Sequence, residues 1–185
     1  MIKLITPLLL VALAVAENGF GEVSAGVGVA GGAVIPIVQD DEGTGPHVSL
    51  RGLFRPINPL GLEISLTIAR FGDPQIDLPG VTSDLEGSSL TAFGLDGILG
   101  ADPGGLIRPF FIVGIGYFRV SRDQTRAWDS PGAEFGYAGG LGLAIGLTRQ
   151  LQLDLRGRLN IVPAEGSSSR KSAFVQGGLN YYFRI

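Results

Sequence analysis

The side chains that could support catalysis are few in this sequence. The only histidine is His47, which stands two residues before a serine in His47-Val48-Ser49. A histidine that takes the proton of a serine hydroxyl can turn that serine into a nucleophile, but a third group usually has to orient the imidazole. The sequence offers no obvious acid for this role. We therefore expect no catalytic residues, and an enzyme is the least favoured of the functions considered.

Residues that could bind a metal or a cofactor are equally sparse. Asp40-Asp41-Glu42 is an acidic run, but it lacks the glycine and the ligand spacing of a calcium-binding loop. The sequence contains no cysteine, so it has neither thiolate ligands nor disulfides. We expect no metal site and no cofactor, and we interpret the acidic run as a solvated loop.

The remaining charged residues lie in segments where polarity alternates with a period of two. In 60–70 every second residue from Leu60 to Ile68 is leucine or isoleucine, and 151–161 shows a similar aliphatic row. Such alternation predicts β-strands with one apolar face and one polar face. The charged residues expected on the polar face are Arg51, Arg55, Glu63, Asp96, Arg108, Glu134, Asp154, Arg156 and Arg158.

Eight segments of this kind follow one another, and the connections between them alternate in length. Short turns at 56–59, 101–104 and 148–150 alternate with longer polar stretches at 35–46, 72–88, 122–131 and 163–171. This order is typical of an all-β, antiparallel, up-and-down transmembrane barrel with short periplasmic turns and longer extracellular loops. The eight predicted strands are 23–31, 48–55, 60–70, 90–99, 107–121, 133–147, 151–161 and 173–185.

The two faces of the strands differ in size as well as in polarity. One set is aliphatic and aromatic, and the other is mostly Gly, Ala, Ser and Thr with a few charges. The interior of an eight-stranded barrel is just wide enough for side chains to fill it, so we expect the smaller set inside and the apolar set facing lipid. A water-soluble barrel would reverse this arrangement and expose rows of Gly and Ala with only 17% charged residues to keep it soluble.

Aromatic residues on the apolar face fall near the predicted strand ends. We interpret them as two girdles at the membrane interfaces, where an aromatic ring can lie between acyl chains and water. The alternative is that they are ordinary strand-forming residues. The residues of the predicted girdles are Phe20, Phe54, Phe111, Tyr181 and Phe183 toward the periplasm, and Tyr117, Phe135 and Tyr137 toward the loops.

The first sixteen residues have the features of a secretory signal peptide. A short positive start that includes Lys3 precedes an apolar stretch from Leu4 to Val15, and Ala14-Val15-Ala16 fits the cleavage rule. A retained anchor helix is the alternative, but the stretch is too short and contains Pro7. We predict a signal peptide over 1–16 and one barrel domain over 17–185.

The last segment carries a family resemblance. Residues 179–185, LNYYFRI, have alternate apolar residues and an aromatic third from the end, as in the C-terminal insertion signal of bacterial outer-membrane proteins. Ile185 stands where such signals usually have Phe or Trp. Over 17–185 the chain resembles the small eight-stranded barrels of the OmpA and OmpX type. This resemblance implies a Gram-negative outer membrane, with the barrel-insertion machinery as a partner during assembly.

One short motif also resembles an enzymatic barrel. The His-x-Ser spacing of His47 and Ser49 is similar to that of the lipid A deacylase barrels, in which the pair acts on acyl chains from the membrane side. Here both residues have inward parity and lie on a different strand. We expect them to have no catalytic role.

The inward charges are expected to form ion pairs, because charges in a closed interior need partners. The short turn after Arg55 places Glu63 opposite or diagonal to Arg51 and Arg55. The turn at 148–150 predicts a register in which Asp154, Arg156 and Arg158 face Ala144, Gly142 and Gly140. We predict a plugged, ion-paired lumen. The alternative is a set of solvated charges with no specific role.

The expected function is a structural or surface-interaction role in the outer membrane, with a small porin-like channel as the alternative. Outer-membrane lipid and lipopolysaccharide are the expected partners, and we expect a monomer. The net charge of −3 provides no basic surface for nucleic acid.

Overall fold

A computed structural model describes residues 23–37, 43–57, 59–72, 88–100, 106–121, 133–163 and 169–184. Residues 1–16, which the sequence assigns to a signal peptide, and Phe20 of the predicted girdle lie outside these ranges. Within them, no helix is long and apolar enough to cross a membrane.

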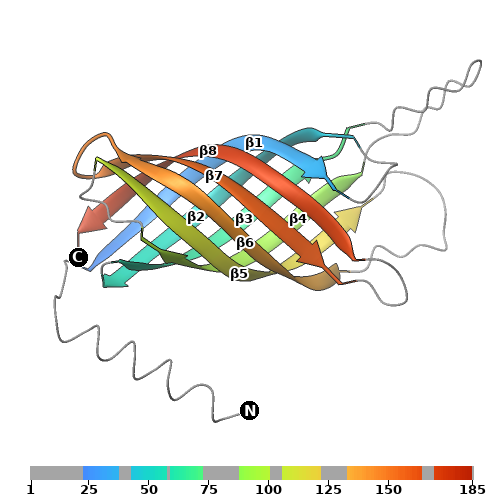
Figure 1. Ribbon diagram of the computed structural model, residues 1–185, viewed down its shortest axis with the longest axis horizontal. Coiled ribbons are helices and arrows are strands. Elements are labelled where there is room, and N and C mark those ends of the chain that lie inside the picture. Colours follow the sequence, from blue (N-terminus) through green and yellow to red (C-terminus); the bar gives the residue numbers. More distant parts are fainter. Residues whose placement is uncertain are drawn as a thin grey trace, which may run out of the picture.

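Eight antiparallel strands form a single closed barrel (Figure 1). Each strand pairs with the next one in sequence, and the last pairs with the first. The predicted fold class is therefore confirmed, and the strands extend the predicted segments by a few residues at several ends. The strands are β1 (Ser24–Pro36), β2 (Gly45–Ile57), β3 (Leu60–Arg70), β4 (Ser89–Leu99), β5 (Ile107–Ser121), β6 (Ala133–Gly146), β7 (Leu151–Val162) and β8 (Arg170–Arg184).

The barrel has two different ends. The segments that follow β1, β3 and β5 are the longest connections, and the segment after β7 lies on the same side of the barrel, which we call the loop end. The short connections 58–59, 100–106 and 147–150 lie at the opposite side, the turn end, where β1 begins and β8 ends. Local chemistry at described residues favours two of these connections. Gly100 has a φ of 102°, which favours glycine, and the hydroxyl of Thr148 accepts a hydrogen bond from the backbone of Leu151 at 2.9 Å.

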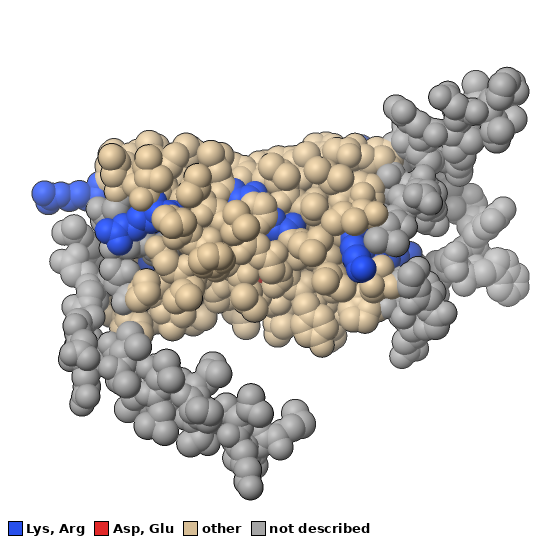
Figure 2. Space-filling view, viewed as in Figure 1, with Lys and Arg blue, Asp and Glu red and all other residues tan. Residues whose placement is uncertain are grey.

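The alternation of the sequence places the aliphatic residues on the outside. In β3, Ile64 and Ile68 are 52% and 54% exposed, whereas Glu63, on the opposite face of the same strand, is only 1% exposed. The visible face of the barrel is almost entirely tan, with Lys and Arg at a few places and hardly any acidic surface (Figure 2). An apolar wall of this extent is stable against hydrocarbon and not against water. The predicted orientation of the two faces is therefore confirmed.

The interior is divided into three layers along the barrel axis. A central polar layer lies between two apolar ones, and the apolar layers contain large aromatic side chains. The interior is thus less dominated by small residues than we expect from the sequence. The loop-end cluster is Val34, Ala69, Phe71, Leu90, Ala92, Phe118, Val162 and Phe174, and the turn-end cluster is Leu53, Ile98, Phe110, Ile112, Ala144 and Tyr182.

Candidate functional site

Four charged side chains form a closed ring of ion pairs at the centre of the lumen. Arg156 of β7 donates from Nη1 to Glu63 of β3, at 2.9 Å to Oε1 and 3.1 Å to Oε2, and its Nη2 contacts Asp154. Arg51 of β2 donates to Asp154 Oδ2 at 2.7 Å, and its Nε lies 3.8 Å from Glu63 Oε1. Each arginine therefore contacts both carboxylates. We call these four residues the central quartet.

The quartet is shielded from solvent on every side. Its members are between 0% and 4% exposed. Buried charges of this kind are stable only when their partners and geometry compensate for the lost hydration. Because the four residues come from three strands, β2, β3 and β7, the ring connects opposite sides of the barrel wall.

A second ion pair extends the polar layer. Arg158 donates to Asp96 Oδ2 at 2.6 Å and to Asn160 Oδ1 at 2.9 Å. Asp96 lies on β4 directly opposite Glu63 of the quartet. Asn180 adds a longer contact to Asp154, at 3.4 Å.

The glycines of β6 make room for these arginines. The predicted register is confirmed, since Gly140, Gly142 and Ala144 pair with Arg158, Arg156 and Asp154. A Cβ atom on Gly142 would lie 2.5 Å from Phe110 and 2.9 Å from the Cβ of Arg156. Any larger residue at this position would therefore displace the side chains that fill the lumen.

Arg55 belongs to a different contact, nearer the turn end. Its guanidinium lies over the ring of Tyr182 at 4.4 Å from the centroid and also donates to the tyrosine hydroxyl. Tyr182 was not among the predicted site residues. The inward parity of the even-numbered residues in β8 would have identified it, because its neighbours Tyr181 and Phe183 point outward.

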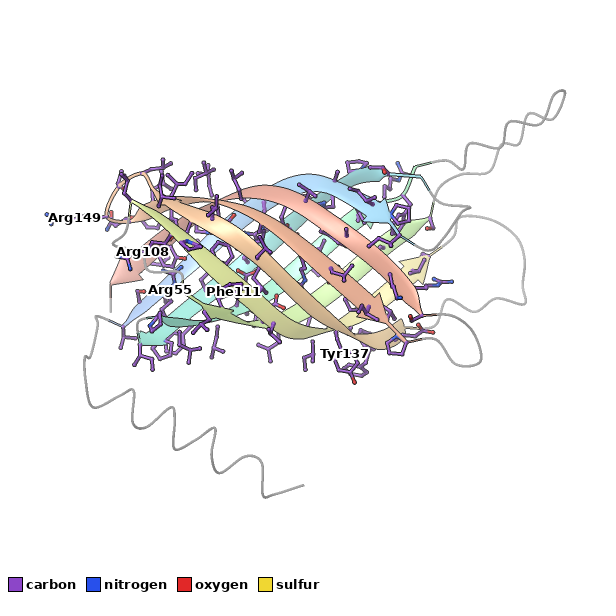
Figure 3. All side chains as sticks on the ribbon, viewed as in Figure 1. Arg55, Arg108, Phe111, Tyr137 and Arg149 are labelled. Carbon is purple, nitrogen blue, oxygen red and sulfur yellow. The ribbon has the colours of Figure 1, made fainter. Side chains whose placement is uncertain are left out.

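Two predicted lumen residues lie outside the central layer. Arg108 has inward parity opposite the buried Ala144, but it is exposed because it is the second residue of β5, at the rim of the turn end (Figure 3). Glu134 is the second residue of β6, pairs with Phe118 and is only partly buried. Parity alone does not tell how deep in the barrel a side chain lies.

His47 and Ser49 point into the lumen but do not contact each other in a catalytic arrangement. His47 Nε2 lies 3.1 Å from Gln176 Oε1, and the hydroxyls of Ser49 and Thr67 lie 2.7 Å apart. Both residues are buried, so acyl chains outside the barrel cannot reach them. In the described part of the chain, no three His, Asp or Glu side chains converge on a metal site.

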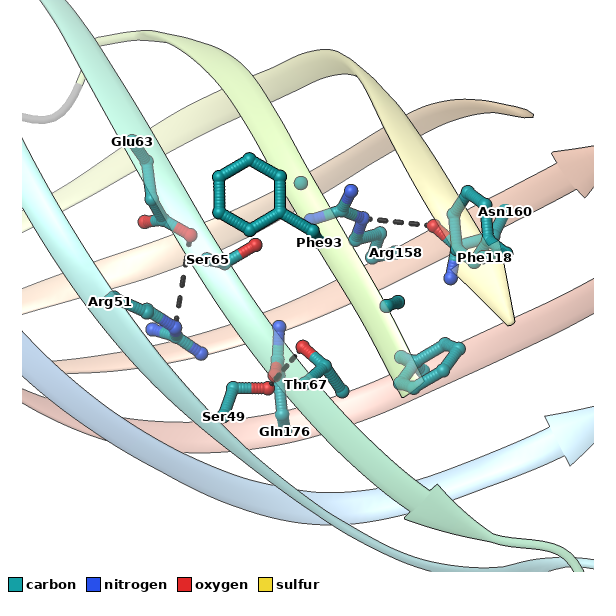
Figure 4. A pocket seen from close by; sticks show the side chains of 13 residues that line it. Ser49, Arg51, Glu63, Ser65, Thr67, Phe93, Phe118, Arg158, Asn160 and Gln176 are labelled. Atoms are coloured by element: carbon teal, nitrogen blue, oxygen red, sulfur yellow. Dashed lines mark hydrogen bonds and ion pairs between the residues drawn. The ribbon is translucent and has the colours of Figure 1, made fainter. Parts of the chain in front are cut away.

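A small cavity lies between the central quartet and the loop-end cluster (Figure 4). Arg51, Glu63 and Arg158 line its inner side, and Phe118 and Phe174 belong to the apolar layer above it. Its remaining polar lining comes from Ser49, Ser65, Thr67, Asn160 and Gln176.

The described residues of the predicted girdles all point away from the barrel. Phe111 and Tyr137 project outward from β5 and β6 (Figure 3), and Tyr117 and Phe135 pack edge to face at 5.3 Å. The exposed members are Phe54, Phe111, Tyr117, Phe135, Tyr137, Tyr181 and Phe183.

Comparisons with known proteins support the fold. No family model and no curated protein matches the sequence. Solved structures do match. Neisserial surface protein A is 16% identical with a TM-score of 0.66, and the match covers 90% of this chain and 100% of that one.

Two barrels of Pseudomonas aeruginosa match as well. The outer-membrane protein OprG is 12% identical with a TM-score of 0.56, covering 91% of this chain and 99% of OprG. The N-terminal barrel of OprF is 14% identical with a TM-score of 0.54, covering 86% and 97% of the two chains. This chain therefore has the fold of the small eight-stranded outer-membrane β-barrels.

Proposed function

We propose that this chain is an integral outer-membrane protein with a closed lumen, which acts as a rigid structural or surface-interaction scaffold. The observation that carries the proposal is the central quartet, held between two apolar layers. The exposed aliphatic wall supports the membrane location, because it would be unstable in water.

The filling of the three layers supports a closed lumen. An ion that crosses the barrel would have to pass Phe118 and Phe174 at the loop end, then the quartet, then Phe110 and Tyr182 at the turn end. Breaking a buried and well-bonded ion pair costs several kcal/mol, roughly 3–5 when one partner is lost. Thermal motion at either apolar layer therefore does not by itself open a wide path.

A surface-interaction role is supported by the shape of the scaffold. Four connections, 37–44, 71–88, 122–132 and 163–169, leave the barrel at the loop end, while the strands below them are fully paired. Binding segments on rigid scaffolds are commonly placed in this way. A narrow channel is the second candidate, and the polar cavity beside the quartet is the observation that favours it.

Planar-bilayer recordings of the purified full-length protein test the proposal. We expect no large, stable conductance from the native chain. In a variant with Phe118→Ala and Phe174→Ala the loop-end layer is emptied, and we expect at most brief openings because the quartet still blocks the path. A stable conductance of the native chain that survives deletion of the loop-end segments would establish a pore instead.

A further inference from the structure

Charge is distributed unevenly between the inside and the outside of the barrel. The carboxylates in the described part of the chain, Glu63, Asp96, Glu134 and Asp154, all occupy inward positions. Several basic side chains instead lie on the outer wall. Among the described outward positions, negative charge is therefore absent and positive charge is present.

Two of these cations lie close together at the loop end. Arg70 is the last residue of β3 and pairs with Ser89 of β4, and Arg119 of β5 pairs with Thr91 of the same strand. They flank β4 on the outer face, two strand spacings apart and offset by two residues along the strands, which is roughly 12 Å between their Cα atoms. Both arginines are exposed, and so is Thr91 between them. Arginine side chains are long enough to reach one headgroup from these positions.

Neither arginine is engaged by the residues that the structure describes. The arginines that form ion pairs and hydrogen bonds, such as Arg51 and Arg156, lie in the lumen. Within the described ranges, neither Arg70 nor Arg119 has such a partner. Their guanidinium donors are available to a ligand.

The outer wall below these arginines becomes steadily more apolar. Phe93, Tyr117 and Phe135 form the next row on β4, β5 and β6, and all three are exposed. Leu95 and Ile115 continue the face toward the middle of the barrel. The order of cations, hydroxyl, aromatic rings and aliphatic side chains follows the order of polarity in a membrane-embedded phospholipid or glycolipid.

We propose that this face of β3, β4 and β5 binds a phosphorylated glycolipid of the outer leaflet, of the lipid A class. Arginine binds phosphate through paired hydrogen bonds, which a lysine cannot reproduce. One cation on each side of β4 suits a headgroup with two separated phosphates. The aromatic and aliphatic rows below the arginines suit several acyl chains. A soluble phosphate would gain nothing from those rows. The inference rests on the proposed membrane location but not on a closed lumen.

Lipid binding to the full-length barrel in a neutral detergent tests the site. Diphosphorylated lipid A is titrated and the bound fraction is measured by native mass spectrometry. We expect Arg70→Gln with Arg119→Gln to weaken binding about tenfold, since two charge-assisted contacts are lost. The matched control is Arg149→Gln, which removes an exposed arginine at the turn end (Figure 3). The control should bind as the native chain does.

Two further measurements distinguish a site for the whole lipid from attraction of the arginines to phosphate alone. Lipid A without phosphates should bind as weakly to the native chain as intact lipid A binds to the double variant. Inorganic phosphate at the same concentrations should not compete. Heat-modifiable gel migration shows that each variant is folded.

Three results would overturn the site. They are binding by the double variant equal to that of the native chain, an affinity loss in the Arg149 control equal to that of the double variant, and displacement of the lipid by free phosphate. A conducting lumen would contradict the proposed function but leave these binding results unchanged.

Discussion

Glu63 and Asp96 lie directly opposite each other on β3 and β4, with both carboxylates almost completely buried. Like charges in facing positions repel each other and destabilise a sheet. Each carboxylate is neutralised by a different arginine of β7, Glu63 by Arg156 and Asp96 by Arg158. A strand on the far side of the lumen thus stabilises the β3–β4 pair.

Replacing Arg156 should be among the most damaging single changes in the barrel. Arg156→Ala leaves Glu63 and Asp154 with only one remaining arginine, Arg51, between them. We expect a loss of about 3–5 kcal/mol in the free energy of unfolding, measured by urea titration in lipid vesicles. Arg149→Ala at the exposed turn should change it by less than about 0.5 kcal/mol. Equal effects of the two changes would contradict the role given to the quartet.

The pair of Asp96 and Arg158 should show measurable coupling. Arg158 is the most exposed of the paired arginines, with 10% of its side chain accessible, so its loss should be milder than that of Arg156. In a double-mutant cycle with Asp96→Asn and Arg158→Gln we expect a coupling energy of about 1–3 kcal/mol. Strictly additive effects would show that the 2.6 Å contact contributes nothing to stability.

Two glycines provide a matched test of how tightly the lumen is filled. Gly142→Ala places a methyl group 2.5 Å from Phe110 and should destabilise the barrel by about 1–3 kcal/mol. Gly157→Ala adds the same group on the outer face of β7, where no atom lies within 4 Å. We expect that change to be neutral or slightly stabilising. Thermal unfolding of both variants, followed by the circular dichroism of the strands, measures the difference.

The contact between Arg55 and Tyr182 can be divided into two parts. Tyr182→Phe removes the hydroxyl that accepts from Arg55 but keeps the ring beneath the guanidinium. We expect a loss of about 1–2 kcal/mol for the hydrogen bond, and a larger loss for Tyr182→Leu, which also removes the cation–π contact. Equal losses for the two variants, measured by urea unfolding, would mean that the ring itself contributes little.

The sequence predicted the strands and their registers because both depend on neighbours along the chain. Alternation identified the inward and outward positions of β3 and β7, and short turns then determined which residues face each other. The pairing of Gly142 with Arg156 is an example of such a register. The diagonal placement of Glu63 relative to Arg51 is another.

Contacts across the lumen could not be predicted in the same way. The bond from Arg156 to Glu63 joins β7 to β3, and its existence depends on how far the strands are staggered around the closed barrel. The alternation of the sequence also does not tell how far along the barrel axis a side chain lies. Arg108 was therefore predicted to lie with the central charges, although it lies at the rim. Tyr182 and Phe118 were overlooked because large aromatic residues were expected on the outer face.

The pairing of β1 with β8 joins Ser24 to Arg184, near opposite ends of the described chain. Neither strand has its second neighbour until the other has been synthesised, so the cylinder cannot close during translation. Before closure, two bare edges could pair with other chains. The topology therefore imposes an order of assembly. The polypeptide must be kept unfolded until its final strand is available. Ring closure is then a late event, with a large entropic cost for bringing the two ends together.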